Sequence, residues 1–491
     1  MHILMVYPRY PNTFWSFRHA LSFLGKKAAF PPLGLLTVAS LLPSAWEVKL
    51  VDMNVEKLRE EDLSLADMVF ISAMIVQKDS AQEVLERAKA LGKRTVAGGP
   101  FFTSCDRESI RGVDHFVLDE AELTLPPFLK DFEAGCPKAV YTSESKPLLA
   151  LTPRPRWSLI NFKHYATMAV QFTRGCPFNC EFCDITKLYG KVTRAKDASQ
   201  FVGEMEALLR AGWRGSVFIV DDNFVGNMKE TRAMLPSLIA WQKEHGFPFS
   251  FFTEASVNLA KDEPLMSLMR DAGFTKVFLG IETPQKESLR ECKKGQNVHV
   301  DLKEVVTTIQ QHGMEVLAGF IVGFDADTKS VFDDQIAFIQ EAGIPTAMVG
   351  LLTALPKTEL WKRLQASGRL LRDSTGDNLS TLLNFVPKMD RDELIAGYRR
   401  ILATIYSERH YYERVHTLLR NFRPAVRTKL QWCDMRAFLH SIIRIGIFSR
   451  ARFRYWRLMC AHAGRKTFPL AVQASILGEH FKRIATRVAA S

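Results

Sequence analysis

The first third of the chain alternates short apolar runs with amphipathic segments. Apolar runs of strand length occupy residues 2–7, 47–55, 66–75, 94–100 and 113–122. Between them, 31–43 has the apolar content of a helix opened by proline, and 80–93 has helical spacing behind Ser80, a suitable N-cap. Strands that alternate with helices predict a parallel sheet covered on both faces, so residues 1–135 should form an α/β domain of Rossmann-like, flavodoxin-like type.

A ligand of such a sheet is expected at the carboxyl ends of its strands. In residues 1–135 these ends carry Tyr7, Asp52, Ser72, Gly98, Gly99 and Glu120. The two glycines would let a large ligand approach the backbone closely. No G-x-G-x-x-G sequence follows the first strand, which disfavours a nicotinamide dinucleotide.

The alternation resumes after a proline-rich stretch, 136–167, which predicts an extended linker. From Met168 onward, strand-like runs occur at 168–173, 215–222, 249–256, 276–283, 314–324 and 347–355, with helical segments between them. Six such strands predict a partial (β/α)6 TIM-like barrel over 168–370, with its chemistry at the C-terminal ends of the strands. Residues 371–491 have helical spacing of apolar residues among many arginines and predict a helical C-terminal domain.

Three of the eight cysteines lie together directly after the first barrel strand. The sequence FTRGCPFNCEFCDI places Cys176, Cys180 and Cys183 within eight residues. A structural zinc site would need a fourth cysteine or histidine at zinc-finger spacing, and a ferredoxin-type site usually has two residues in both gaps and a further cysteine. The spacing therefore predicts a four-iron cluster held by three cysteines, with one iron left open for a small molecule.

The motif CPFNCEFC after a barrel strand resembles the radical S-adenosylmethionine (SAM) superfamily. The resemblance implies that the open iron binds SAM, and that an electron from an external flavodoxin-like or ferredoxin-like protein cleaves it to a deoxyadenosyl radical. It also implies a set of SAM-binding residues: Asp221 and Asp222 for the amine, Glu254 and Ser256 for the ribose or carboxylate, and Phe182, Gly280, Glu282 and Val322 near the adenine. For Asp221, Asp222 and Glu282, a helix cap or a surface carboxylate is the alternative.

A Rossmann-like unit ahead of the barrel resembles the cobalamin-binding members of this superfamily. The stretches FPPLGLLTVASLLP, VAGGP, DEAE and RGCPFNCEFCDI are similar to the hopanoid and bacteriochlorophyll methylase group, and the resemblance covers nearly the whole chain. It implies a cobalamin site that includes Tyr7, Ser72, Gln77, Gly98, Gly99 and Glu120. The D-x-H-x-x-G motif that supplies a cobalt-ligating histidine elsewhere is absent, so residues 72–77 should approach the lower face of the corrin instead. A cobalamin-free scaffold domain is the alternative.

The function implied by the resemblance is a cobalamin-dependent radical SAM methyltransferase. The deoxyadenosyl radical makes a carbon radical on the substrate, which then takes the methyl group of methylcobalamin at an otherwise unactivated carbon. This mechanism requires no general base, so we predict no catalytic side chain. A non-methylating cobalamin-dependent radical enzyme, performing a cyclisation, an oxidation or a rearrangement, stays open as the alternative.

The net charge of +12 is concentrated in the C-terminal region. Residues from Arg391 onward contain 20 Lys and Arg against 6 Asp and Glu, and arginines alternate with apolar residues over 442–459. This pattern is typical of a helix on anionic lipid, which would suit a hydrophobic lipid or tetrapyrrole-like substrate. A solvated basic face is the alternative, and the absence of a recognisable RNA-binding module disfavours nucleic acid. Since the first residues lack a signal-peptide layout, we expect a cytoplasmic protein, with contact to the cytoplasmic face of the membrane as an option.

Overall fold

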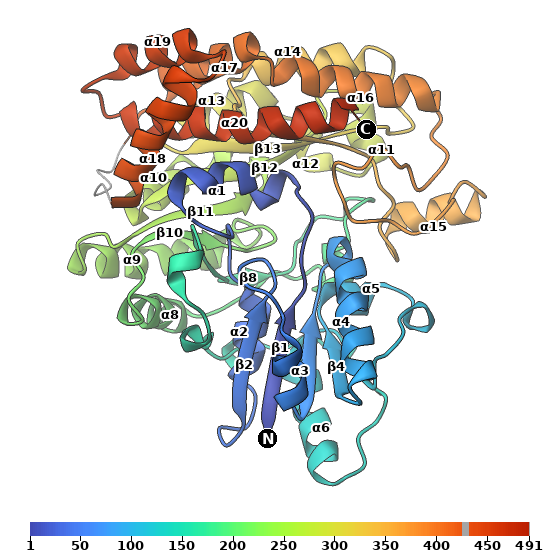
Figure 1. The fold of residues 1–491 in the computed structure, drawn as a ribbon. Coiled ribbons are helices and arrows are strands. Elements are labelled where there is room, and N and C mark those ends of the chain that lie inside the picture. Colours follow the sequence, from blue (N-terminus) through green and yellow to red (C-terminus); the bar gives the residue numbers. More distant parts are fainter. Residues whose placement is uncertain (425–431, 491) are drawn as a thin grey trace.

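The N-terminal residues build the first of two parallel sheets. The computed structural model describes residues 1–424 and 432–490, and its first sheet has the strand order β2-β1-β3-β4-β5-β6 (Figure 1). The strands are β1 (His2–Tyr7), β2 (Glu47–Asp52), β3 (Met68–Ser72), β4 (Arg94–Gly98), β5 (His115–Val117) and β6 (Val140–Tyr141). The helices that accompany them are α2 (Leu33–Ala39), α3 (Glu60–Leu65), α4 (Lys78–Ala90), α5 (Pro100–Ser104) and α6 (Ala121–Glu133). All strand pairs are parallel, which confirms the predicted Rossmann-like sheet.

Both faces of this sheet are buried because successive side chains of a strand point to opposite sides. Ile3 and Met5 of β1 belong to one apolar core, and Leu4 and Val6 belong to another. The helix after β3 begins earlier than predicted: Gln77 is the N-cap of α4, and Ser80 lies inside the first turn, where its hydroxyl accepts a hydrogen bond from the backbone N–H of Arg9. The N-cap prediction for Ser80 was therefore wrong.

The second sheet contains all six strands predicted between residues 168 and 355. Its order is β14-β13-β12-β11-β10-β7, and every pair is parallel. The strands are β7 (Met168–Val170), β10 (Gly215–Ile219), β11 (Phe249–Ala255), β12 (Phe274–Glu282), β13 (Glu315–Val322) and β14 (Ala347–Leu351). The helices around them are α8 (Ala198–Arg210), α9 (Met228–Glu244), α10 (Glu263–Ala272), α11 (Lys286–Glu291), α12 (Gly295–Val298), α13 (Leu302–Gln311), α14 (Val331–Glu341) and α15 (Glu359–Ala366). The sequential order of parallel strands confirms the partial barrel.

The C-terminal region is helical, as predicted. It consists of α16 (Arg391–Ile405), α17 (Glu408–Asn421), α18 (Trp432–Ser441), a π-helical turn (Ile442–Ile447), α19 (Arg452–His462) and α20 (Phe468–Ala490), which lie across the barrel in Figure 1. Arg414 of α17 is fully buried and joins this region to the barrel, since its guanidinium donates to the carbonyl oxygens of Ile344 and Ile405 and to Gln340. Burial lowers the pKa of Arg414 to about 10. None of the described helices combines the length and apolarity that a membrane crossing would need.

The segment between β1 and α2 leaves the first sheet and packs against the rest of the molecule. Its helix α1 (Arg18–Leu24) lies beside α18 and α20 (Figure 1). His480 of α20 contacts the carbonyl oxygen of Phe14 through Nε2 at 3.1 Å, and the indole of Trp15 stacks on Phe218 of β10. The N-terminal segment therefore packs against the barrel and the C-terminal helices. The domain boundaries predicted from the sequence did not indicate this contact. The predicted divisions at 135, 167 and 370 stay predictions.

Candidate active site

The three clustered cysteines lie at the carboxyl-terminal edge of the second sheet. They sit between the two strands of a small antiparallel hairpin, β8 (Thr173–Arg174) and β9 (Arg194–Ala195), and beside α7 (Ile185–Leu188). Gly175 opens the loop with a φ of +93°, and a Cβ atom there would lie 2.7 Å from the carbonyl oxygen of Val192. Only glycine satisfies both conditions, so this residue sets the path of the chain into Cys176.

Hydrogen-bond donors surround the thiols. The backbone amides of Phe178 and Ile185 donate to Cys176 and Cys183, and burial raises the pKa of both thiols. Two side-chain amides come from further away: Asn223 Nδ2 lies 3.9 Å from Cys176 Sγ, and Gln296 Nε2 lies 3.8 Å from Cys180 Sγ. Such donors favour sulfur in its anionic, metal-bound form.

Asp221 and Asp222 hold the start of the cysteine loop. The carboxylate of Asp221 accepts hydrogen bonds from the backbone N–H of Phe172 (2.8 Å) and from the N–H and hydroxyl of Thr173 (2.9 and 2.7 Å). Oδ2 of Asp222 accepts from the N–H of Gly175 at 2.8 Å. Burial raises the pKa of Asp221 to about 7 and that of Asp222 to about 6. Both oxygens of Asp221 are thus occupied by the chain itself.

Glu254 completes a group of carboxylates at the ends of β10, β11 and β12. Its pKa is raised to about 8 by burial and then by the charges of Asp222, Asp221 and Glu282. Among residues 1–424 and 432–490 no hydrogen bond to its carboxylate is present, and the hydroxyl of Ser256 at the same strand end is buried without a partner. This edge therefore offers acceptor oxygens that the protein leaves unpaired, and excess negative charge suits a cationic ligand.

Glu282 ends β12 in an unusual conformation. Its φ is +65°, and the pairing of β12 with β13 shifts register between Gly280 and Glu282. The carboxylate forms a buried ion pair with Lys294 (Oε1 to Nζ, 2.5 Å), whose Nζ also lies 5.8 Å from the ring centre of Phe182. Burial acts to lower the pKa of Lys294, but Glu282 and the nearby cysteines raise it above its usual value.

The remaining SAM candidates differ in accessibility. The carbonyl oxygen of Gly280 accepts from Asn297 Nδ2 at 3.0 Å, and its Cα faces the Glu282–Lys294 pair so closely that a Cβ would lie 2.6 Å from Nζ. The side chain of Val322 is fully buried in the core of β13, so only its backbone can reach a ligand.

Several cobalamin candidates at the end of the first sheet are engaged by the chain itself. Gly99 has a φ of +90°, and a Cβ there would lie 2.4 Å from the hydroxyl oxygen of Ser72. A Cβ on Gly98 would lie 2.5 Å from the carbonyl oxygen of Val117. Gln77 is buried and bridges the N–H of Met74 and the carbonyl oxygen of Pro8. The glycines are therefore required by the protein's own packing, whatever ligand lies above them.

Two further strand-end residues, Tyr7 and Asp52, stand opposite each other in the register of β1 and β2. Burial raises the pKa of Tyr7, and the hydrogen bond that its phenol oxygen accepts from the Gln77 side chain opposes that shift only in part. Asp52 accepts hydrogen bonds from Asn54 and from the hydroxyl of Tyr165, and burial raises its pKa to about 6.

Glu120 connects the two sheets. Its buried carboxylate accepts hydrogen bonds from Arg174 (2.8 Å) and from both terminal nitrogens of Arg194 (3.0 and 2.8 Å), while Glu122 pairs with the same Arg174 at 2.8 Å. Arg174 immediately precedes Gly175, so the DEAE sequence after β5 binds the entry to the cysteine loop. The carboxyl-terminal edges of the two sheets face each other across this contact.

Comparison with known proteins identifies the family. Family models match in three segments: "B12 binding domain" over residues 27–129, "Radical SAM superfamily" over 170–339 and "Domain of unknown function (DUF4070)" over 358–491. The chain is 43% identical to an "uncharacterized methyltransferase" of Synechocystis over 93% of its length and 86% of the relative's. It is 34% identical to the hopanoid C-2 methylase of Rhodopseudomonas palustris, over 93% of this chain and 88% of that protein. The chain belongs to the B12-binding radical SAM methyltransferases.

Solved structures of B12-dependent radical SAM enzymes share this fold. The methyltransferase TsrM of Kitasatospora setae superposes with a TM-score of 0.63 at 14% identity, covering 92% of this chain and 97% of that one. The enzyme OxsB superposes with a TM-score of 0.64 at 13% identity, covering 100% of this chain and 80% of that one. The similarity confirms the fold of two parallel sheets followed by helices.

Membership of this family confirms the predicted cofactors: a four-iron cluster, SAM and cobalamin. The residues present fit the first two groups, because three thiols with amide donors suit an iron–sulfur cluster and the unpaired acceptors Glu254 and Ser256 suit a cationic ligand with hydroxyl groups. On the first sheet, the side chain of Met74, 43% exposed, offers an apolar surface beside β3. In the described part of the chain, no group of three His, Cys, Asp or Glu side chains is arranged for a single metal ion.

The sequence reasoning missed the segment KKGQN that follows α11. It brings Gln296 to Cys180, and Lys294 and Asn297 to the end of β12. Directly before the segment, the carbonyl oxygen of Cys292 accepts a hydrogen bond from the N–H of Glu181 in the cysteine loop. Nothing in the local pattern marks these residues as functional. Asn223 also went unnoticed, although its position directly after Asp222 at a strand end was a usable signal.

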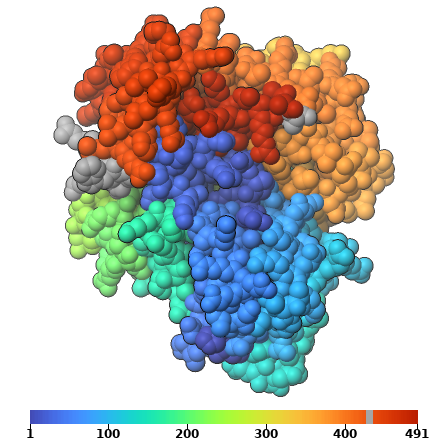
Figure 2. Space-filling view, viewed as in Figure 1, coloured from blue at the N-terminus to red at the C-terminus, as the bar shows by residue number. Residues whose placement is uncertain are grey.

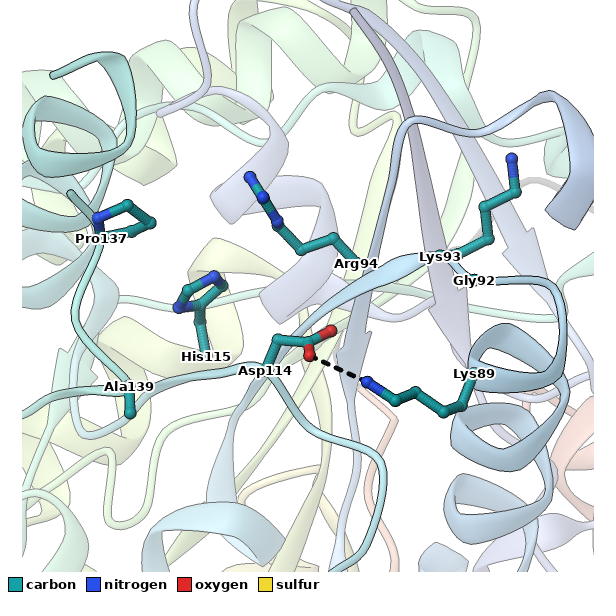
Figure 3. A pocket seen from close by; sticks show the side chains of 8 residues that line it. All are labelled: Lys89, Gly92, Lys93, Arg94, Asp114, His115, Pro137 and Ala139. Atoms are coloured by element: carbon teal, nitrogen blue, oxygen red, sulfur yellow. Dashed lines mark hydrogen bonds and ion pairs between the residues drawn. The ribbon is translucent and has the colours of Figure 1, made fainter. Parts of the chain in front are cut away.

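A pocket of about 490 Å³ lies at the other edge of the first sheet (Figure 3). It is lined by Arg94 and His115, which begin β4 and β5, and by Lys89, which points toward Asp114 at 3.3 Å. In parallel sheets ligands bind at the carboxyl ends of strands, whereas this pocket is at the amino ends. It is therefore separate from the site around the cysteines.

Proposed function

We propose that this enzyme methylates an unactivated carbon of a flat, polycyclic, apolar lipid. Support for the substrate class comes from an aromatic surface on the inner side of the second sheet, formed by Trp15, Phe30, Phe218, Phe252 and Phe278 and called here the aromatic face. Phe218 and Phe252 are stacked with ring centres 4.3 Å apart and planes 2° apart. Trp15 stacks on Phe218 at 6.3 Å and 12° and contacts Phe278 at 5.1 Å.

The aromatic face is only partly covered. Trp15, Phe30, Phe252 and Phe278 all retain accessible surface, although large aromatic side chains gain most when fully buried. Phe30 approaches Phe218 and Phe252 at 5.3 and 6.1 Å from the side of the N-terminal segment. A cluster of flat rings that stays partly accessible favours a flat apolar ligand stacked on its exposed surface.

The aromatic face adjoins the carboxylate group. Phe252 precedes Glu254 by two residues on β11, and Phe278 precedes Gly280 by two residues on β12. Residues two apart on a strand point to the same side and lie about 6–7 Å apart. A substrate on the aromatic face would therefore have its edge next to the SAM-binding strand ends.

The cofactor-binding residues follow from the same arrangement. We assign Cys176, Cys180 and Cys183 to the cluster, and Asp222, Glu254, Ser256, Gly280, Glu282 and Phe182 to SAM. Asp221 positions the cysteine loop, and Val322 contributes through its backbone. We assign Tyr7, Ser72, Gln77, Gly98 and Gly99 to the sheet edge that faces cobalamin. Glu120 connects this edge to the cysteine loop.

With these groups bound, the cofactors supply the radical and the transferable methyl group, and the chain's own residues bind, align and shield. The Glu120–Arg174 contact holds the two sheet edges together, which fixes the distance between the cofactors. The aromatic face excludes water from the neighbourhood of the radical. We propose that the electron comes from an external reductant of the flavodoxin or ferredoxin type.

The test is product analysis with anaerobically reconstituted enzyme and a pentacyclic triterpenoid substrate. Methyl transfer predicts a methylated lipid together with both S-adenosylhomocysteine and deoxyadenosine. Phe252→Ala should raise the KM for the lipid while SAM binding stays unchanged, and Cys180→Ala should give no product. A chlorin is offered in a parallel assay, and methylation of the chlorin without methylation of the triterpenoid would overturn the proposed substrate class.

A non-methylating reaction is the second candidate. It is favoured by the similarity to the anaerobic magnesium-protoporphyrin IX monomethyl ester cyclase of Rubrivivax gelatinosus, which is 22% identical over 82% of this chain and 77% of that protein. The higher identity to the hopanoid methylase argues for methylation. Deoxyadenosine without S-adenosylhomocysteine would decide for the second candidate.

A further inference from the structure

An apolar stripe runs along the outside of α18 and the π-helical turn that follows it. Met435, Leu439, Ile443 and Ile447 are exposed to 50%, 56%, 48% and 53%. They are spaced four residues apart, so they lie one above another on the same side of the helix. Soluble proteins rarely expose contiguous apolar surface of this kind, so the stripe indicates an interaction site.

The stripe continues through Phe448, which follows the π-helical turn, onto α19. Phe448 is 78% exposed, and Phe453 and Trp456 of α19 are 76% and 40% exposed. The indole N–H of Trp456 donates to the carbonyl oxygen of Gly446 at 3.0 Å, which places α19 against the π-helical turn. The seven side chains, Met435, Leu439, Ile443, Ile447, Phe448, Phe453 and Trp456, are called here the docking face. In Figures 1 and 2, α18 and α19 form a projecting edge of the molecule.

The surroundings of the docking face are strongly basic. From Met435 to Gly478 the chain contains seven Arg and one Lys and no Asp or Glu. Arg450, Arg452 and Arg454 are exposed, and within residues 1–424 and 432–490 none of them forms an ion pair. Unpaired cations around an exposed apolar stripe are complementary to a surface that is both anionic and apolar.

We propose that the docking face binds the surface of an anionic lipid bilayer. The apolar side chains would enter the boundary between head groups and acyl chains, and the arginines would contact lipid phosphates. RNA would match the arginines but would leave the aliphatic stripe in water, so the bilayer is the better match to both features.

The docking face is also connected to the aromatic face. His440 Nδ1 contacts the carbonyl oxygen of Phe23 at 3.0 Å, and Arg444 donates to the hydroxyl of Ser22 at 2.7 Å, so α18 and the π-helical turn hold α1. The segment that leads into α1 carries Trp15. A lipid that leaves the bilayer at this edge would meet the N-terminal segment next. This consequence depends on the proposed function, whereas the docking itself does not.

The test is co-sedimentation of the holoenzyme with vesicles of phosphatidylcholine alone and of phosphatidylcholine mixed with phosphatidylglycerol. The wild-type protein should bind the mixed vesicles and release them at high salt, since surface charges are screened. The triple variant Arg450→Gln, Arg452→Gln, Arg454→Gln should bind about a hundredfold more weakly, because each arginine contributes roughly a fivefold factor near an anionic surface. Phe448→Ser with Phe453→Ser should lose binding at all salt concentrations.

Matched controls use equally exposed residues elsewhere. Leu65 and Leu148 are exposed to 68% and 73%, so Leu65→Ser with Leu148→Ser removes comparable apolar surface. Lys57→Gln with Arg107→Gln and Lys229→Gln removes the same charge. Controls that bind like the wild type, with docking-face variants that fold but do not bind, support the proposal.

Three results would overturn it: no binding of wild-type protein to mixed vesicles, equal loss in the controls, or retention of tRNA at concentrations where vesicles are ignored. Vesicle binding requires no turnover, so the two proposals can fail separately. If the enzyme binds vesicles through this face but does not methylate a triterpenoid, only the proposed function is refuted.

Discussion

Glu254 should make the stability of the cofactor-free protein depend on pH in a direction unusual for a carboxylate. Its pKa is raised from the ordinary 4.5 to about 8, first by burial and then by Asp222, Asp221 and Glu282. The folded state therefore holds this proton more tightly than the unfolded state. The stabilisation that this bound proton gives is complete below the pKa of the unfolded state. It is lost as the pH rises toward the pKa of the folded state. Replacement by glutamine keeps the shape and removes the charge.

The expected gain from Glu254→Gln follows from the size of the pKa shift. One pKa unit corresponds to about 1.4 kcal/mol. At about pH 5.5 only about one unit of the shift contributes, so the variant should be more stable by about 1.4 kcal/mol. At about pH 8 almost the whole shift has been expressed, and the gain approaches about 4 kcal/mol.

Denaturant unfolding of the cofactor-free proteins at both pH values measures this difference. The matched control is Glu244→Gln, which changes an exposed carboxylate that forms no hydrogen bond in the described structure and should leave stability unchanged. A gain for Glu254→Gln that is the same at both pH values, or a loss at the higher one, would refute the reasoning. That outcome would mean that Glu254 is ionised in the folded protein and that neighbouring groups balance its negative charge.

Three further predictions concern the contacts around the cysteines. Glu120→Gln leaves Arg194 buried without a carboxylate and leaves Arg174 with Glu122 alone, so it should cost about 3–5 kcal/mol in denaturant unfolding; a loss below about 1 kcal/mol would contradict the idea that this contact joins the sheets. Gly280→Ala places a Cβ 2.6 Å from Lys294 Nζ and should weaken SAM binding at least about tenfold with iron content unchanged, whereas Gly295→Ala, with nothing within 4 Å of its Cβ, should do neither. Equal SAM affinities in the two glycine variants would contradict this. Cys180→Ala should abolish the cluster, measured as iron and sulfide content, while cobalamin binding persists; a variant that retains the full iron content would exclude Cys180 as a ligand.

Much of the fold could be predicted from local patterns of apolar and polar residues in the sequence. Apolar runs of strand length between amphipathic segments located the six strands of the second sheet and five of the six in the first, because strands buried on both faces of a parallel sheet are nearly continuous apolar runs. The exception was Val140–Tyr141, which is too short to make a recognisable run. The spacing of Cys176, Cys180 and Cys183 with Gly175 also indicated a metal-binding loop, since ligands of one cluster on one loop are a local feature.

The roles of single side chains were harder to predict because they depend on contacts across the chain. Gln296 approaches Cys180 from 116 residues away, and Glu120 holds Arg194 from 74 residues away. Asp221 and Asp222 are adjacent in sequence, yet one is occupied entirely by backbone and hydroxyl donors and the other by a single N–H. Sequence periodicity specifies which face of an element a residue lies on, but it does not specify what stands opposite.

The sequence by itself determined the two parallel sheets, the cysteine loop and the concentration of positive charge near the C-terminus, since each arises from residues close together along the chain. Only the tertiary structure decided that the N-terminal segment contributes Trp15 to the inner side of the barrel, and that Lys294 pairs with Glu282 beside the cysteines. It also decided that four apolar residues of the basic region face outward together. The physical reason is that a strand or helix is selected by its neighbours in sequence, whereas burial and charge pairing are set by whichever distant segment comes to lie against it.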